Sequence, residues 1–162
     1  MRFFIFILSM VVFVSCRQAT AKVEVAEVAS QVAEDFPTLP KLIRIHELTK
    51  AKIVGWGPFN GLHEQMTALQ EVFTREALVL KLEEVEAACR DFESAPFPVV
   101  FDRPAVRSRA KVLRTFIQKT QADLHYREDF APDLIQVVRS YNALIRQLNQ
   151  VGQEETPDDL PF

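Results

Sequence analysis

Residues 131–152 decide the fold class, and they read APDLIQVVRSYNALIRQLNQVG. Their large apolar side chains recur every three or four residues, as one face of an α-helix requires: Leu134, Val137, Val138, Tyr141, Leu144, Ile145 and Leu148. Residues 128–133 form an acidic, proline-containing turn suited to a helix start, and Gly152 stands where a helix would stop. The stretch therefore predicts an amphipathic helix with one face in a core.

Three stretches upstream have the same helical spacing. The first runs from about residue 58 to residue 73, and its start could extend back to Lys50. It carries this stripe: Leu62, Met66, Leu69, Val72 and Phe73. The second follows Thr74, a predicted N-cap, and runs to Glu93 with this stripe: Leu78, Leu82, Val85, Cys89 and Phe92. The third begins with an acidic cap at Asp102 and Pro104 and ends near Arg127, with this stripe: Val106, Ala110, Leu113, Phe116, Ile117, Thr120 and Leu124.

Four such helices with short connections predict an all-α, antiparallel (up-down) four-helix bundle over residues 51–152. Residues 94–104 contain three prolines and cannot be regular helix, so their apolar members should seal one end of the bundle: Phe97, Val99, Val100 and Phe101. The glycine-rich residues 55–61 predict a break or a kinked helix entry, with Trp56 and Phe59 packing inward. Residues 41–52 suit either a short helix or an extended segment.

The N-terminus predicts an exported protein. Residues 1–15 combine Arg2 with an apolar run that is too short to span a membrane, which is typical of a secretory signal. Cys16 directly follows Ser15, and this pair resembles the bacterial lipobox, in which the cysteine is acylated and becomes the new N-terminus. The resemblance implies that Cys16 is a lipid-attachment site, since two or more acyl chains anchor a protein stably.

The rest of the chain divides around the bundle. Residues 16–50 comprise the lipidated Cys16, a polar tether and an N-terminal segment, of which residues 23–36 form an amphipathic stripe. Residues 153–162 are acidic, contain two prolines and predict a disordered tail. Without the leader the net charge is about −4, which argues against a nucleic-acid partner. Cys89, in a helical stripe, predicts a small buried residue.

The combined pattern resembles small, mostly uncharacterised helical-bundle lipoproteins of Bacteroidota-type bacteria. Three features carry the resemblance: the leader with Ser15-Cys16, the segment FPVVFDRPAVRSRAKVL at residues 97–113, and YNALI at residues 141–145. The resemblance implies the helical fold and the envelope location, and it implies no activity.

No pattern in the chain predicts catalysis, and we expect no catalytic residue, no bound metal and no cofactor. His63-Glu64 begins like the zinc-protease motif His-Glu-x-x-His, but Thr67 occupies the place of the second histidine. A haem between helices would need axial ligands such as His63 or Met66 with His125, and the Cys-x-x-Cys-His motif of covalent attachment is absent.

The strongest charge feature is the third predicted helix, on which Arg107, Lys111 and Arg114 share one face. This face predicts either contact with anionic lipid headgroups or an acidic partner, or pairing with the acidic second helix. Pairing is favoured because the two helices should be neighbours of opposite charge. Trp56, beside the glycine-rich break, is a further candidate for partner contact.

The sequence therefore predicts a lipoprotein of the bacterial cell envelope, anchored through Cys16 and facing the periplasm. We expect a non-enzymatic binding or accessory module with an envelope protein as a possible partner. The alternative is a carrier of a small ligand, haem or metal in the bundle interior.

Overall fold

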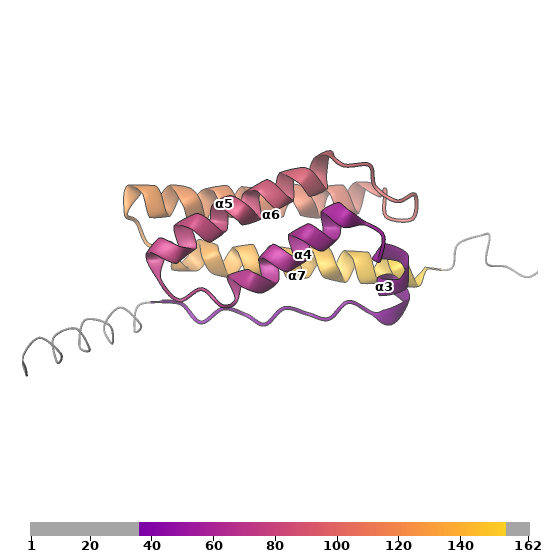
Figure 1. The fold of residues 1–162 in the computed structure, drawn as a ribbon, viewed down its shortest axis with the longest axis horizontal. Coiled ribbons are helices and arrows are strands. Elements are labelled where there is room, and N and C mark those ends of the chain that lie inside the picture. The colour runs from indigo at the N-terminus through magenta and orange to yellow at the C-terminus, as the bar shows by residue number, and fades with distance from the viewer. Residues whose placement is uncertain (1–35, 155–162) are drawn as a thin grey trace, which may run out of the picture. The chain divides into compact units, whose positions relative to one another are not determined.

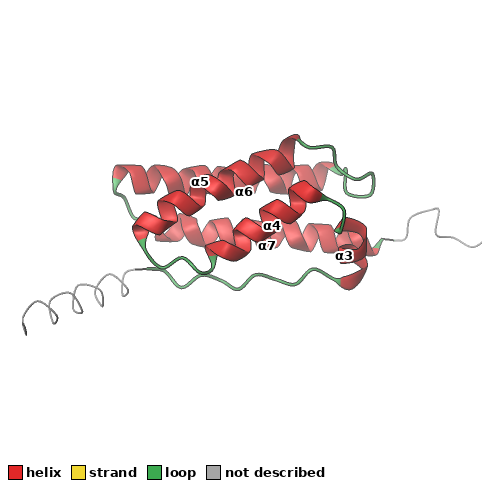
Figure 2. Ribbon diagram, viewed as in Figure 1, coloured by secondary structure: helices red, strands yellow, loops and turns green. Residues whose placement is uncertain are grey.

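The computed structural model describes residues 36–154, which are all-α (Figures 1 and 2). The described helices are α3 (Glu47–Ile53), α4 (Gly57–Leu69), α5 (Arg75–Ser94), α6 (Pro104–Tyr126) and α7 (Ala131–Gln153), and no strand is present among these residues. The predicted signal, Cys16, the amphipathic segment at 23–36 except its last residue, and the tail beyond residue 154 lie outside the described residues.

The four long helices pack in chain order, each against the next. α4 packs on α5, α5 on α6 and α6 on α7, while the short α3 packs on α7. The predicted stripes are buried on all four helices apart from Phe73, which is exposed, and Phe116, which is half-buried. The interpretation of their spacing is confirmed for the other members. These are the largest fully buried side chains: Tyr141, Phe59, Phe92, Phe101, Leu62, Met66, Leu69, Leu78, Leu82, Leu113, Ile117 and Leu134. Residues 37–154 form one compact unit around this core.

The first long helix is shorter than its stripe predicts. α4 ends at Leu69, Phe73 is 64% exposed, and α3 is a separate helix rather than a continuation toward Lys50. After α4, Thr74 is the N-cap of α5, as predicted. Its backbone is extended, and its hydroxyl accepts a hydrogen bond from the Ala77 N–H (3.3 Å). The extended backbone at Thr74 sets the start of α5, and residues 70–73 form the connection between the two helices.

The segment between α5 and α6 contains two incorrect predictions. Phe97 and Phe101 are buried as expected, but Val99 is 91% exposed because it lies at the tip of a turn in which Phe101 N–H bonds to Pro98 C=O. α6 begins at Pro104 without a side-chain cap, and the Asp102 carboxylate accepts a hydrogen bond from Arg107 Nε instead. The proline start is confirmed and the acidic cap is wrong.

Gly152 does not stop the last helix. It is a buried residue within α7, which continues to Gln153, and so the predicted tail begins after the helix rather than at residue 153. A Cβ at this position would lie 2.5 Å from Thr49 Oγ1 and 3.0 Å from Thr49 Cα. Glycine is therefore required here because α3 approaches the backbone of α7 closely.

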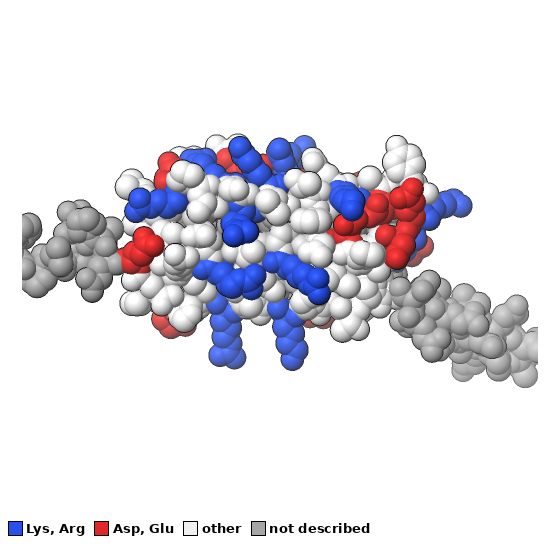
Figure 3. Space-filling model, turned by 180° about the vertical axis from the view of Figure 1, so that it is seen from behind, with Lys and Arg blue, Asp and Glu red and all other residues white. Residues whose placement is uncertain are grey.

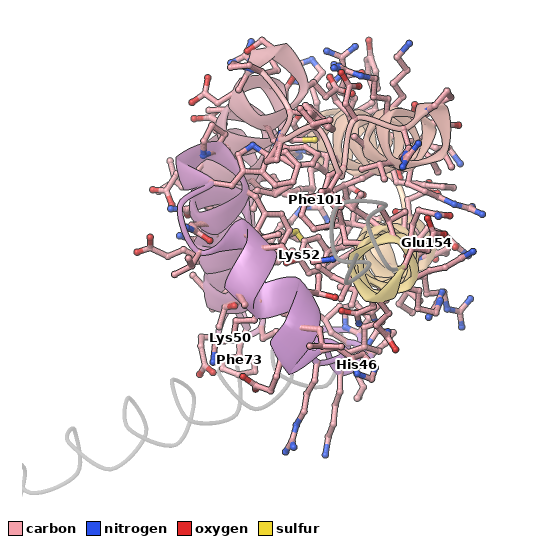
Figure 4. The ribbon with its side chains drawn as sticks, turned by 90° about the vertical axis from the view of Figure 1, so that its right-hand side faces the viewer. His46, Lys50, Lys52, Phe73, Phe101 and Glu154 are labelled. Carbon is pink, nitrogen blue, oxygen red and sulfur yellow. The ribbon has the colours of Figure 1, made fainter. Side chains whose placement is uncertain are left out.

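Figure 4 shows the end of the molecule at which α3 lies against α7. Lys52 of α3 points to the end of α7 and donates a hydrogen bond to the Glu154 carbonyl (3.4 Å). Within residues 36–154, no helix combines the length and the apolar character that a membrane crossing requires.

Candidate functional site

An extended segment lies along α7, and we call residues 37–46 the strap. Residues 41–52, which suited either a helix or an extended segment, contain both: the strap is extended to His46, and α3 begins at Glu47. Figure 1 shows the strap running the length of the helical layer before it turns into α3. The strap makes hydrogen bonds with α7 rather than with a neighbouring strand.

Two buried asparagines of α7 hold the strap by its backbone. The Asn142 side chain accepts from Ile43 N–H (3.0 Å) and donates to Lys41 C=O (2.9 Å). The Asn149 side chain accepts from His46 N–H (2.9 Å) and donates to Arg44 C=O (2.9 Å). We call these two side chains the Asn clamps. Each satisfies a donor and an acceptor of the strap, so neither amide is buried without partners.

The clamps repeat in register. Asn142 and Asn149 are seven residues apart on α7, a rise of about 10.5 Å along a helix. The strap carbonyls that they bind belong to Lys41 and Arg44, which are three residues apart. Three residues of extended chain span roughly 10 Å. The two repeats therefore match without distortion, and they place Lys41 and Arg44 in equivalent positions.

A groove of about 650 Å³ opens between the strap, α3 and α4. Its apolar lining comes from all three elements: Leu42, Ile43, Ile45, Ile53, Val54 and Phe59. Its polar lining includes Asn60, His63 and Thr67 of α4 and Lys50 of α3. Apolar walls with a few polar groups are typical of a site that binds an organic ligand or a partner side chain.

His63 is a polar group of this groove that is held by contacts with other side chains. Its Nδ1 lies 2.5 Å from the Tyr141 hydroxyl, and its ring stacks with Phe59 at a centroid distance of 6.0 Å. Burial lowers the pKa of His63 and raises that of Tyr141, so a neutral imidazole faces a protonated phenol near neutral pH. We assign the Tyr141 hydroxyl as the donor to Nδ1, because this is the tautomer that leaves its proton with an acceptor among the described residues. The imidazole proton is then on Nε2, which makes His63 a hydrogen-bond donor.

The predicted basic face of α6 is partly neutralised within the protein. Arg107 pairs with Asp102 (2.7 Å), which lowers the pKa of that carboxyl, and its guanidinium lies 4.2 Å from the Phe97 ring centroid. Arg114 bonds to Glu93 of α5 (3.0 Å), which is the expected pairing with the acidic helix. Lys111 is exposed and forms no ion pair within the described part of the chain.

Trp56 belongs to the core at one end of the helices. It is 6% exposed, and its ring lies 4.9–5.7 Å from four phenylalanine rings: Phe59, Phe92, Phe97 and Phe101. The predicted inward packing is confirmed. The indole offers little surface for the partner contact also predicted for it, because the sealing phenylalanines cover it.

The structure does not bring the candidate haem ligands together. His63 lines the groove and Met66 is fully buried, whereas His125 lines a different hollow with Val79 of α5. No group of three or more His, Cys, Asp or Glu side chains suited to a metal occurs within residues 36–154. Burial raises the pKa of Cys89 to about 12, with a further contribution from Glu93, so this thiol stays protonated and unreactive.

A cluster of three titratable side chains lies where α6 packs on α7. Lys119 Nζ lies 2.9 and 3.1 Å from the two carboxylate oxygens of Asp133. Burial, together with a hydrogen bond to Asp133 and its charge, raises the pKa of the neighbouring Asp123. These three side chains face one another between helices and line none of the hollows described above, so we assign them a structural role.

The sequence contained a signal for the clamps that periodicity alone does not reveal. Arg-x-x-Asn occurs twice in α7, at residues 139–142 and 146–149, with a spacing of seven. An asparagine next to an apolar helical stripe needs partners when it is buried, and two in register suggest one continuous partner.

Comparisons with family models, curated proteins and solved structures found no match for this chain.

Proposed function

We propose that the chain is a lipoprotein of the bacterial cell envelope whose helical part is a non-enzymatic binding or accessory module. The leader at residues 1–15 and the Ser15-Cys16 junction support export and acylation. In this proposal the acyl chains on Cys16 hold the protein to the membrane, with the helices facing the periplasm.

We further infer that α4, α5, α6 and α7 form an antiparallel, up-down four-helix bundle. The packing of each helix on the next and the short connections between them support this arrangement. The strap and α3 are additions on the outside of α7.

The groove is the observation that carries the binding role. It combines apolar walls with the oriented imidazole of His63, and the Asn clamps fix the strap that forms one wall. A rigid wall lowers the entropic cost of binding. The partner in this proposal inserts an apolar group between strap and α4 and accepts a hydrogen bond from His63.

The test uses two variants with the same change at different places. Val54 lies at the groove and is 74% exposed, whereas Val99 lies at the tip of a distant turn. Native lipoprotein is purified with its bound envelope components from cells that carry wild type, Val54→Glu or Val99→Glu. A component retained by wild type and by Val99→Glu but lost from Val54→Glu supports the proposal. Equal retention by all three contradicts it.

A carrier of a small ligand is the second candidate, favoured by the volume of the groove. About 650 Å³ lies within the range of pockets that enclose small organic ligands, roughly 300–1,000 Å³. The site would be the groove rather than the bundle interior, where the large side chains are already packed. Native mass spectrometry distinguishes the two candidates, because a carrier retains a small molecule in the absence of any protein partner.

A further inference from the structure

Strap and helix α7 together present a repeated basic surface. Arg139 and Arg146 of α7 each stand three residues before a clamp asparagine. Lys41 and Arg44 of the strap are the two residues whose carbonyls accept hydrogen bonds from the clamps. All four side chains are exposed, and we call them the basic patch. Each repeat of the clamp thus contributes one base from the strap and one from α7.

The basic patch is not neutralised within the described part of the chain. None of its four side chains forms an ion pair there. The strap contains no acidic residue, and neither do residues 134–153 of α7. Figure 3 shows the side of the molecule opposite to the view of Figure 1, with Lys and Arg gathered over its middle and acidic side chains mainly toward the ends. The patch therefore attracts anions although the whole chain is acidic.

The clamps make this surface rigid. They fix the strap backbone at Lys41, Ile43, Arg44 and His46, and with it the origin of both basic side chains. With four backbone hydrogen bonds in place, the bases of strap and helix repeat at a common spacing of about 10 Å along α7. This spacing is close to the screening length at physiological salt, so neighbouring charges of the patch act on the same anionic surface.

We propose that the basic patch docks the folded part of the protein on anionic lipid headgroups of the membrane that holds its anchor. The inference rests on the proposed acylation of Cys16. Lys41 follows Cys16 by twenty-five residues, so the covalent chain limits its distance from the anchor to roughly 85 Å. Tethering at this range raises the effective concentration of headgroups at the patch, and a weak contact is then enough to fix which face meets the bilayer.

This surface differs from the face of α6 that the sequence suggested. Arg107 and Arg114 are half-buried and already paired, and moving them to headgroups would cost their bonds to Asp102 and Glu93. The patch residues lose no such bonds. Arg44 of the patch also lines the groove, so docking brings one edge of the groove to the headgroups, while α3 and α4 form its other walls.

The test measures vesicle binding without the lipid anchor, so that its result does not depend on Cys16. Residues 17–162 retain the whole compact unit that begins at Pro37. The unacylated chain is titrated with vesicles of phosphatidylcholine alone and with vesicles containing phosphatidylglycerol. The test variant is Arg139→Gln/Arg146→Gln. The matched control is Arg90→Gln/Arg103→Gln, which removes the same charge from two exposed arginines outside the patch.

We expect wild type and control to bind only the anionic vesicles and to release them as salt is raised. The test variant should bind roughly 30-fold more weakly at unchanged melting temperature, since each base near an anionic membrane contributes about a fivefold factor. Lys41→Gln/Arg44→Gln should show a similar loss. Equal weakening by test and control variants would overturn the proposal, because net charge alone would then explain binding. Absence of binding by wild type, or tighter binding to soluble polyglutamate than to vesicles, would also overturn it. Failure of acylation in cells would refute the anchor and leave these vesicle results standing.

Discussion

Removing an Asn clamp should release one repeat of the strap and leave the helices folded. Asn142→Ala deletes two hydrogen bonds, one to Ile43 N–H and one to Lys41 C=O. A typical intramolecular hydrogen bond contributes about 1 kcal/mol net. The loss is therefore about 2 kcal/mol, and it falls on the strap because the side chain holds nothing else.

The direct assay is amide hydrogen exchange at Ile43, whose N–H bonds to the clamp. A loss of about 2 kcal/mol corresponds to roughly 30-fold faster exchange through local opening. Exchange of amides in the middle of α6 should stay unchanged. Gln150→Ala is the matched control, because Gln150 is an exposed amide on the same helix and the strap's hydrogen bonds to α7 go to Asn142 and Asn149.

Asn142→Asp separates hydrogen bonding from packing. It keeps the size of the side chain and the acceptor for Ile43, but it replaces the donor with a carboxylate oxygen against Lys41 C=O. The strap should be at least as labile as in the alanine variant at neutral pH, and acidification should restore part of its protection. Unchanged exchange at Ile43 in both variants would refute the clamp as the element that holds the strap.

Three further predictions concern the core and the titratable groups. Gly152→Ala should lower the free energy of unfolding by roughly 1–3 kcal/mol, because its methyl group overlaps Thr49 of α3. Gly61→Ala has open space around its Cβ and should instead raise the free energy of unfolding by up to about 1 kcal/mol through helix propensity. Urea melts measure both changes. Burial lowers the pKa of His63 from 6.5, so wild type should lose stability as the pH falls below about 6.5, and His63→Gln should lose less over the same range. The raised pKa of Asp123 means that its ionised form destabilises the fold, so Asp123→Asn should raise the melting temperature at pH 7, and the gain should vanish below pH 3.8, where both states are protonated. Thermal melts check both predictions. Equal loss of stability by wild type and His63→Gln at low pH, or no gain in melting temperature for Asp123→Asn at pH 7, would contradict the corresponding pKa assignment.

Helical periodicity was sufficient to predict the four long helices, because each buries one continuous stripe. It failed where a residue other than an apolar one decides the local structure. The stripe continues to Phe73, but residues 70–73 form the connection to the α5 cap at Thr74, and Gly152 serves contact with α3 rather than termination. The exposure of Val99 has the same origin, since the turn at Pro98 directs it to solvent.

The candidate site was harder to predict, because it depends on contacts between residues about a hundred positions apart. Asn142 and Asn149 bond to backbone groups of the strap, and any sequence offers such groups. Only the repeat of Arg-x-x-Asn in α7 indicates them. The pairing of Arg114 with Glu93 was predictable, since neighbouring helices carried opposite charges, but the basic patch required the position of the strap.

The lipid anchor is the central claim of the proposed function, and the mass of the mature protein tests it most directly. The full chain is expressed in a bacterium that processes lipoproteins, purified from membranes and measured intact and after proteolysis. We predict that the mature protein begins at Cys16 and carries two or three acyl chains there. The Cys16→Ala variant should carry no acyl chains and should be absent from the membrane fraction. A mature protein that begins at another residue, or an unmodified Cys16, would contradict the account.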